Sequence, residues 1–104
     1  DLKEYIGLDK YEYLFNRIKY ITTLCKECFR KKICNNPNLK KNLKFQLFGM
    51  DFIYDTNYNP YLLEINKGPQ MSYINLIDKK LKENVYNDLL KLVYNGDNTL
   101  FIEV

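Results

Sequence analysis

The sequence has no tryptophan, no histidine and no alanine among its 104 residues. It also lacks any apolar run that approaches the roughly 18 residues a helix needs to cross a membrane, so it predicts no membrane partner. The first residues, D-L-K-E-Y, include neither an initiator methionine nor a signal peptide. We therefore expect a chain that was excised from a longer protein.

Cysteine is scarce and odd in number, at Cys25, Cys28 and Cys34. This argues against a complete disulfide framework and favours a reducing, cytoplasmic compartment. A structural zinc ion takes four ligands, and beside C25-K-E-C28 the sequence offers one further thiol and no histidine. We expect these two thiols to pack along the buried stripe of a helix, since free cysteine behaves as a small apolar residue.

The net charge of +3 falls well short of the clustered basic surface that nucleic-acid binding requires. The run R30-K31-K32, with Lys40, Lys41 and Lys44, is either a basic patch for an acidic partner or a solvated helix end. We favour the helix end, where lysines also complement the helix dipole. Most of the ten tyrosines fall at core positions and no RNA-binding motif is present, so we expect no nucleic-acid partner.

The first part of the chain predicts one long amphipathic helix. Apolar residues recur at intervals of three and four from Lys10 to about Lys32. Asp9 is the expected N-cap, and the helix should end before the breaker cluster N35-N36-P37-N38. The stripe consists of Tyr11, Leu14, Ile18, Ile21, Cys25 and Cys28, with Phe15 and Phe29 beside it.

An antiparallel hairpin is predicted next. Residues 44–55 are rich in Phe, Ile, Tyr and Leu without a helical stripe, which is typical of a strand. The turn T56-N-Y-N59 leads to Pro60, which a strand tolerates at its first residue, and residues 61–66 form the second strand.

A second amphipathic helix follows the hairpin. Its apolar positions run from Ile74 to Val93, and Gly96 suits the C′ position that ends a helix. Residues 99–104 are a candidate last strand. The order helix, hairpin, helix predicts an α+β fold in which two amphipathic helices flank an antiparallel sheet and pack on one of its faces.

The hairpin places polar residues opposite one another if the turn closes between Asp55 and Pro60. The expected pairs are Ile53 with Leu62, Asp51 with Glu64, and Gly49 with Asn66. Because side chains alternate along a strand, these six residues share one face. The opposite face should pack on the core, and it carries Phe48, Met50, Phe52, Tyr54, Tyr61, Leu63 and Ile65.

The converging polar residues indicate a metal site. Facing like charges destabilise a sheet, so either one carboxylate is protonated or a cation sits between them. Asp51, Glu64 and Asn66 offer the hard oxygen ligands that Mg²⁺ prefers, and Mg²⁺ completes its shell with water and substrate phosphates. The simpler interpretation is that these residues are solvated on an open sheet face.

Two quoted segments carry a resemblance to a known family. F45-Q-L-F-G-M-D-F-I-Y-D55 followed by P60-Y-L-L-E-I-N-K-G-P69 resembles the tubulin tyrosine ligase-like family of the ATP-grasp superfamily. Its pattern is a strand with F-G-x-D, a short turn, and then an L-L-E-[IV]-N-x-x-P strand and loop. The resemblance implies that residues 1–104 are the C-terminal part of an ATP-grasp catalytic domain.

Carried over by position, the resemblance assigns roles to three residues. Asp51, Glu64 and Asn66 would bind two Mg²⁺ ions that hold the β- and γ-phosphates of ATP, with Glu64 bridging both and Glu64 and Asn66 counted as catalytic. Lys67 stands at a variable position of the family and is a candidate contact for a phosphate or an acidic acceptor, although a solvated loop lysine is the simpler interpretation. Gly68 stands where family members often carry a small residue.

The implied activity is ligation of a free amino acid (Tyr, Glu or Gly) to a protein acceptor such as tubulin, in a cytoplasmic, cytoskeleton-associated protein. The nucleotide-gripping lysines and the adenine pocket would lie upstream of Asp1, so we expect the 104-residue chain alone to be inactive. Two alternatives remain open. One is a non-catalytic family member that binds microtubules or another acidic partner, and the other is an ATP-grasp ligase with a small-molecule acceptor.

Overall fold

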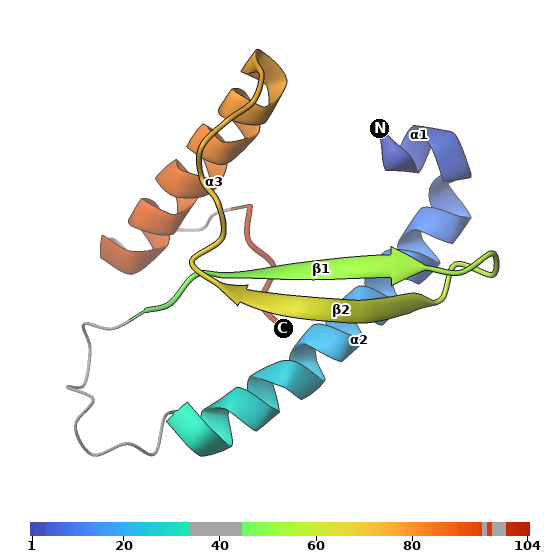
Figure 1. Cartoon of the computed structure of the whole chain (residues 1–104), viewed down its shortest axis with the longest axis horizontal. Coiled ribbons are helices and arrows are strands. Elements are labelled where there is room, and N and C mark those ends of the chain that lie inside the picture. Colours follow the sequence, from blue (N-terminus) through green and yellow to red (C-terminus); the bar gives the residue numbers. More distant parts are fainter. Residues whose placement is uncertain (34–44, 95, 97–99) are drawn as a thin grey trace. The chain divides into compact units, whose positions relative to one another are not determined.

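A computed structural model describes residues 1–33, 45–94, 96 and 100–104. The elements in this range are α1 (Leu2–Ile6), α2 (Leu8–Ile33), β1 (Phe48–Tyr54), β2 (Pro60–Lys67) and α3 (Leu76–Tyr94). The chain divides into one unit of residues 1–67 with Val104 and a second unit of residues 68–103. The predicted α+β class, with a two-stranded antiparallel sheet, is confirmed (Figure 1).

Helix α1 was not predicted, although the sequence carries its signal. The Asp1 side chain caps it by accepting a hydrogen bond from the backbone N–H of Glu4. The Glu4 carboxylate in turn accepts a hydrogen bond from the N-terminal amino group of Asp1. Such a reciprocal D-x-x-E pair satisfies backbone donors that a helix start leaves free. Gly7 then separates α1 from α2 with a φ of 86°, a backbone conformation that glycine adopts without strain.

Helix α2 is longer than the predicted helix at its N-terminal end. Asp9 is not its N-cap but lies in its first turn, because the helix begins at Leu8 and the Tyr11 N–H donates to the Gly7 carbonyl at 3.0 Å. The predicted stripe is confirmed at Leu14, which is buried, and at its half-buried neighbours. Cys25 is half-buried, but Cys28 is exposed, so the prediction that both thiols pack on the buried stripe was wrong for Cys28.

The hairpin packs on α2 within the first unit. The rings of Phe29 and Phe48 stack with centroids 5.2 Å apart, and the Thr22 hydroxyl lies 3.8 Å from the Met50 sulfur. Figure 1 shows the two strands running across the helix. Packing of a helix on one sheet face is thus confirmed for α2. Among the described residues the buried ones are few, namely Ile6, Leu14 and Pro60.

The pairing of the strands differs from the prediction at one point. Asp51 faces Glu64 and Gly49 faces Asn66, as predicted, but Ile53 faces Tyr61 instead of Leu62. The shift falls between Asp51 and Phe52, where β2 contains one extra residue, Leu63. Such a bulge places two residues of one strand against a single residue of the other.

The bulge changes which side chains pack on α2. Leu62 pairs with Phe52 and is half-buried, whereas Leu63 is 64% exposed. Tyr54 and Tyr61 are also exposed, so the predicted core face was wrong for these two tyrosines and for Leu63. Phe48, Met50, Phe52 and Ile65 are half-buried, in agreement with the prediction.

The turn of the hairpin is organised by one carboxylate. Asp55 Oδ1 accepts the backbone N–H groups of Asn57 and Asn59, each at 2.9 Å, and the Asn59 side-chain amide donates to Oδ2 at 3.0 Å. An acidic side chain that bonds backbone N–H groups a few residues on is a common way to stabilise a turn. These donors, the Asn59 side chain foremost, hold the pKa of Asp55 below its usual range.

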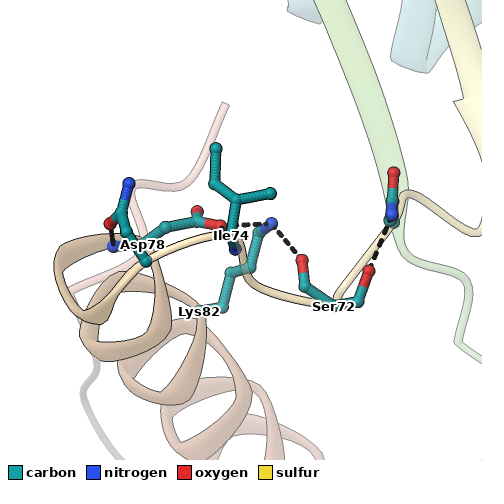
Figure 2. Close-up of polar contacts among 6 residues, drawn as sticks. Ser72, Ile74, Asp78 and Lys82 are labelled. Atoms are coloured by element: carbon teal, nitrogen blue, oxygen red, sulfur yellow. Dashed lines mark hydrogen bonds and ion pairs between the residues drawn. The ribbon is translucent and has the colours of Figure 1, made fainter.

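The second unit consists of a short loop and α3. Asn75 accepts the Asp78 N–H at 2.8 Å, which caps the start of the helix, while Asp78 accepts the Ile74 N–H at 3.1 Å. Figure 2 shows Lys82 reaching both Asp78, at 2.9 Å, and the Ser72 carbonyl, at 2.6 Å. The Lys82 ammonium, together with the Ile74 N–H, lowers the pKa of Asp78.

Helix α3 ends close to its predicted position. Gly96 has a φ of 67°, and its N–H donates to the Lys91 carbonyl at 3.1 Å, so it terminates the helix as expected of a C-terminal glycine. The predicted last strand is wrong over residues 100–104, which form no regular structure. Among the described residues, the sheet consists of β1 and β2, and residues 100–104 do not join it. No helix in the described ranges combines the length and apolar character of a membrane span.

Candidate metal site

The bulged hairpin brings Asp51, Glu64 and Asn66 together on its exposed face. The two acids are direct cross-strand partners, and Asn66 stands one pair further along, opposite Gly49. The Asn66 amide nitrogen lies 2.8 Å from Glu64 Oε1 and 3.4 Å from Asp51 Oδ2. The structure therefore places all three predicted ligands within reach of one another.

The amide of Asn66 explains how the hairpin tolerates two facing acids. Its NH₂ group has two hydrogens and donates to both carboxylates, so it supplies positive charge density between them. The sequence suggested a protonated acid or a bound cation as the means of relieving the repulsion. The side-chain amide is a third means, and it needs neither a proton nor an ion.

The donor set fits a hard cation. The site offers four carboxylate oxygens and one amide oxygen, which are the ligands that Mg²⁺ takes in proteins. All three side chains are exposed, which leaves room for the waters and phosphates that complete a magnesium shell. If the Asn66 amide rotated by half a turn, its oxygen would take the position that its nitrogen now occupies. This rotation has little steric consequence, because the oxygen and the NH₂ group are nearly equal in size.

Lys67 and Gly68 follow the site directly. Lys67 is the last residue of β2, where it pairs with Phe48, so it belongs to the strand and not to the following loop as predicted. Its side chain is exposed. Gly68 has a φ of 74°, and a Cβ built there would meet nothing within 4 Å, so backbone conformation and not space is what favours glycine at this position.

The other candidate sites of the sequence lie partly outside the described residues. The described parts of the chain hold no group of three or more Cys, Asp or Glu side chains that could bind a metal ion. Cys34, Lys40, Lys41 and Lys44 lie outside the described residues. Of the basic run R30-K31-K32 and the lysines that follow it, the described part is the exposed end of α2, with Arg30, Lys31 and Lys32 in its last turn. Cations at that end complement the helix dipole.

Comparison with known protein families shows which family the chain belongs to. The family model described as "Tubulin-tyrosine ligase family" matches residues 2–100. The chain belongs to the tubulin-tyrosine ligase family. The resemblance found in the two hairpin segments thus extends over almost the whole chain.

Curated relatives share this membership. The chain is 40% identical over 60 residues to tubulin glycylase 3D of Tetrahymena thermophila, covering 58% of this chain and 6% of the relative. It is 29% identical over 97 residues to the probable alpha-tubulin polyglutamylase Ttll1 of the same organism, covering 89% of this chain and 22% of the relative. It is 38% identical over 53 residues to the probable tubulin polyglutamylase TTLL2 of Homo sapiens, covering 50% and 9%.

The chain therefore spans less than a quarter of the length of each of these relatives. No solved structure matches it. By their names, the relatives are tubulin-modifying ligases, so the chain is part of a family of such enzymes.

Proposed function

We propose that the protein carrying this chain is an ATP- and Mg²⁺-dependent ligase that adds an amino acid to a protein acceptor, with tubulin as the acceptor. The observation that supports this most is the meeting of Asp51, Glu64 and Asn66 on one exposed face of a hairpin in a tubulin-tyrosine ligase family member. Relatives named glycylase and polyglutamylase make glycine and glutamate the first amino acids to test, followed by tyrosine.

Each residue of the proposed site has a distinct role. Glu64, which faces Asp51 across the hairpin and accepts from Asn66, would be shared by two Mg²⁺ ions, while Asp51 and Asn66 would each hold one. Lys67, exposed at the end of β2, contacts a phosphate or an acidic acceptor. The chain is part of an ATP-grasp domain, and the remainder of that domain supplies the lysines that hold the phosphates and the pocket for adenine.

The reaction joins a carboxylate to an amine. The acceptor carboxylate attacks the γ-phosphorus of ATP, which gives an acylphosphate and ADP. The amine of the incoming amino acid then attacks the acyl carbon, phosphate leaves, and the amine's proton passes to solvent. Asp51, Glu64 and Asn66 would hold the magnesium ions, which would supply neutralisation of the phosphate charge. The hairpin's contribution is to hold Asp51, Glu64 and Asn66 in a fixed mutual geometry before the nucleotide arrives.

The test uses the full natural protein. It is incubated with tubulin, Mg²⁺–ATP and one amino acid at a time, and intact-mass and peptide mass spectrometry look for additions the size of one residue. We expect addition that requires ATP and disappears in Glu64→Gln, which keeps the shape of the side chain but removes its charge. Glu83→Gln, which changes an exposed acid of α3, is the matched control and should retain activity.

The opposite result is equally informative. A folded full-length protein that modifies tubulin with none of the three amino acids would contradict the proposed activity on tubulin. Binding to microtubules without modification would then favour the non-catalytic interpretation. Addition that survives Glu64→Gln unchanged would remove Glu64 from the proposed metal site.

A further inference from the structure

The hairpin pairs its strands in two different registers. At the turn end Tyr54 faces Pro60 and Phe52 faces Leu62, whereas at the open end Asp51 faces Glu64. If the turn-end register continued along the whole ladder, Leu63 would face Asp51, and Glu64 would alternate onto the side that packs against α2. The one-residue bulge at Leu63 is therefore what makes the carboxylate pair compatible with the turn.

The two leucines alone do not decide where the extra residue lies. If the open-end register continued to the turn, Leu62 would face Ile53, and Leu63 would take its place opposite Phe52. The face toward α2 would keep a leucine at that point, so the leucines specify the register weakly. At the turn end the shift would matter more, because the exposed Tyr61 would replace the buried Pro60 opposite Tyr54. The register is therefore held at the turn end.

A relay of hydrogen bonds from α2 to the turn holds that register. The Tyr13 hydroxyl donates to Asn59 Oδ1 at 2.9 Å, and the Asn59 amide donates to Asp55 Oδ2 at 3.0 Å. The Asp55 N–H donates to the Asn59 carbonyl at 3.1 Å. In the other register Asp55 would face Pro60, which has no N–H to offer the ladder, and the bonds between Asp55 and Asn59 would be broken.

The same helix also holds the open end of the hairpin. Thr22 contacts Met50, and Phe29 stacks on Phe48, both beyond the bulge. Helix α2 thus fixes β1 and the turn at two points. The extra residue of β2 must be accommodated between them, and it lies directly beside Asp51 and Glu64.

We propose that Tyr13 is a positioning residue for the metal site, acting through Asn59 and Asp55. Its hydroxyl holds the turn-end register. Both registers pair Asp51 with Glu64, but only the turn-end register places the bulge beside them, and a bulge bends its strand and increases the local twist. Tyr13 thereby sets the angle at which Glu64 faces Asp51. The statement about register stands on the contacts of the hairpin alone. The consequence for catalysis rests on the function proposed above.

Engineered cross-links report the register directly. In the full-length protein, the pair Ile53→Cys with Tyr61→Cys reports the observed register, and the pair Ile53→Cys with Leu62→Cys reports the alternative one. A disulfide requires Cβ atoms about 3.5–4.5 Å apart, so it forms most readily between directly opposed positions. Mild oxidation followed by peptide mass spectrometry identifies each linked pair and separates it from links to native thiols.

We expect the Tyr61 pair to form faster in the unaltered background. Tyr13→Phe removes only the hydroxyl, so the fold should survive, and the ratio of the two cross-linking rates should shift toward the Leu62 pair. Loss of one neutral hydrogen bond corresponds to about a fivefold change in such a ratio. Asn59→Ala breaks the same relay from the other side and should give a shift in the same direction.

The matched control is Tyr20→Phe, which removes a hydroxyl from an exposed tyrosine of the same helix and should leave the ratio unchanged. If Tyr13→Phe and Asn59→Ala both leave the ratio at its original value, the proposal is wrong. If the ligase assay gives activity, Tyr13→Phe should also raise the KM for Mg²⁺–ATP more than it changes kcat. If that assay fails altogether, the cross-linking result still decides the claim about register.

Discussion

Two acidic sites lie on the same hairpin, and their surroundings differ. Asp55, at the turn, accepts two backbone N–H groups, the Asn59 amide and the Tyr61 hydroxyl, so its oxygens are occupied by its own chain. Asp51 and Glu64 share a single amide donor from Asn66. Most of their acceptor capacity is therefore available to a ligand.

The difference separates a structural acid from the two acids that we propose as ligands. A carboxylate whose lone pairs are satisfied by neighbouring donors stabilises the segment that supplies those donors. A pair of acids held face to face with few donors leaves the chain with repulsion that a cation would relieve. The hairpin thus uses one acid to define its turn, and the other two are the acids that we propose as metal ligands.

The largest effect that separates the two sites is expected from Asp51→Asn. This change removes one proposed metal ligand and should reduce ligation by the full-length protein by about 100-fold, the scale on which metal sites respond to lost partners. Thermal stability should not fall, because the substitution also removes a like charge facing Glu64. Initial rates of tubulin modification and a melting curve, measured on the same preparation, provide the check. Strong destabilisation with retained activity would reverse the assignment of Asp51.

An intermediate effect is expected from Asn66→Asp, which replaces the bridging amide with a third carboxylate. The variant loses the donor between Asp51 and Glu64 and gains a like charge, so its melting temperature without divalent cations should fall. Added Mg²⁺ should raise that temperature more in the variant than in the natural protein, since a ligand that binds only the folded state stabilises it. Asn57→Asp, an exposed change in the turn, is the control and should show no added response to Mg²⁺.

The smallest effect is expected from Asp55→Asn and concerns pH. Hydrogen bonds hold the pKa of Asp55 in the folded protein below its ordinary value of 3.8. Its contribution to stability is therefore complete above that ordinary value, and it is lost as pH falls through the lower, folded-state pKa. The variant should be less stable at neutral pH.

Denaturation at a series of pH values from neutral down to about 2 measures this effect. The stability that Asp55 contributes is lost as the pH falls from its unfolded-state pKa toward its lower, folded-state pKa. The natural protein should lose more stability than Asp55→Asn over the acidic end of the series. Equal slopes for the two proteins would show that Asp55 does not titrate as its contacts imply. Asp78→Asn offers the same comparison of pH dependence in the second unit, because Lys82 lowers the pKa of Asp78.

Much of the local structure was predictable from sequence. The spacing of apolar residues located α2 and α3, and alternation with turn residues located the hairpin. The facing pair Asp51 and Glu64 was also predicted, although from a turn closing between Asp55 and Pro60. In the structure the turn closes one residue earlier on the side of β2, and the bulge at Leu63 restores the same pair. Helix α1 was missed although its D-L-K-E start carries a capping signal, since five residues provide too short an apolar pattern.

The prediction failed where the local pattern gave two similar answers. A regular hairpin and a bulged one both bring Asp51 to Glu64, and they differ in whether Leu62 or Leu63 faces α2 and whether Pro60 or Tyr61 lies opposite Tyr54. Asp9 was misplaced as an N-cap for a related reason. Acidic residues are favoured both at the N-cap and in the first turn, where they complement the helix dipole.

The sequence by itself determined the two long helices, the hairpin between them and which acids share a face, because spacing and alternation follow from backbone geometry. Only the tertiary structure decided the position of the bulge and the bond from Asn66 to both acids. Those features depend on contacts between residues far apart in the chain, such as Tyr13 with Asn59, at a point where two adjacent leucines gave the local pattern no preference.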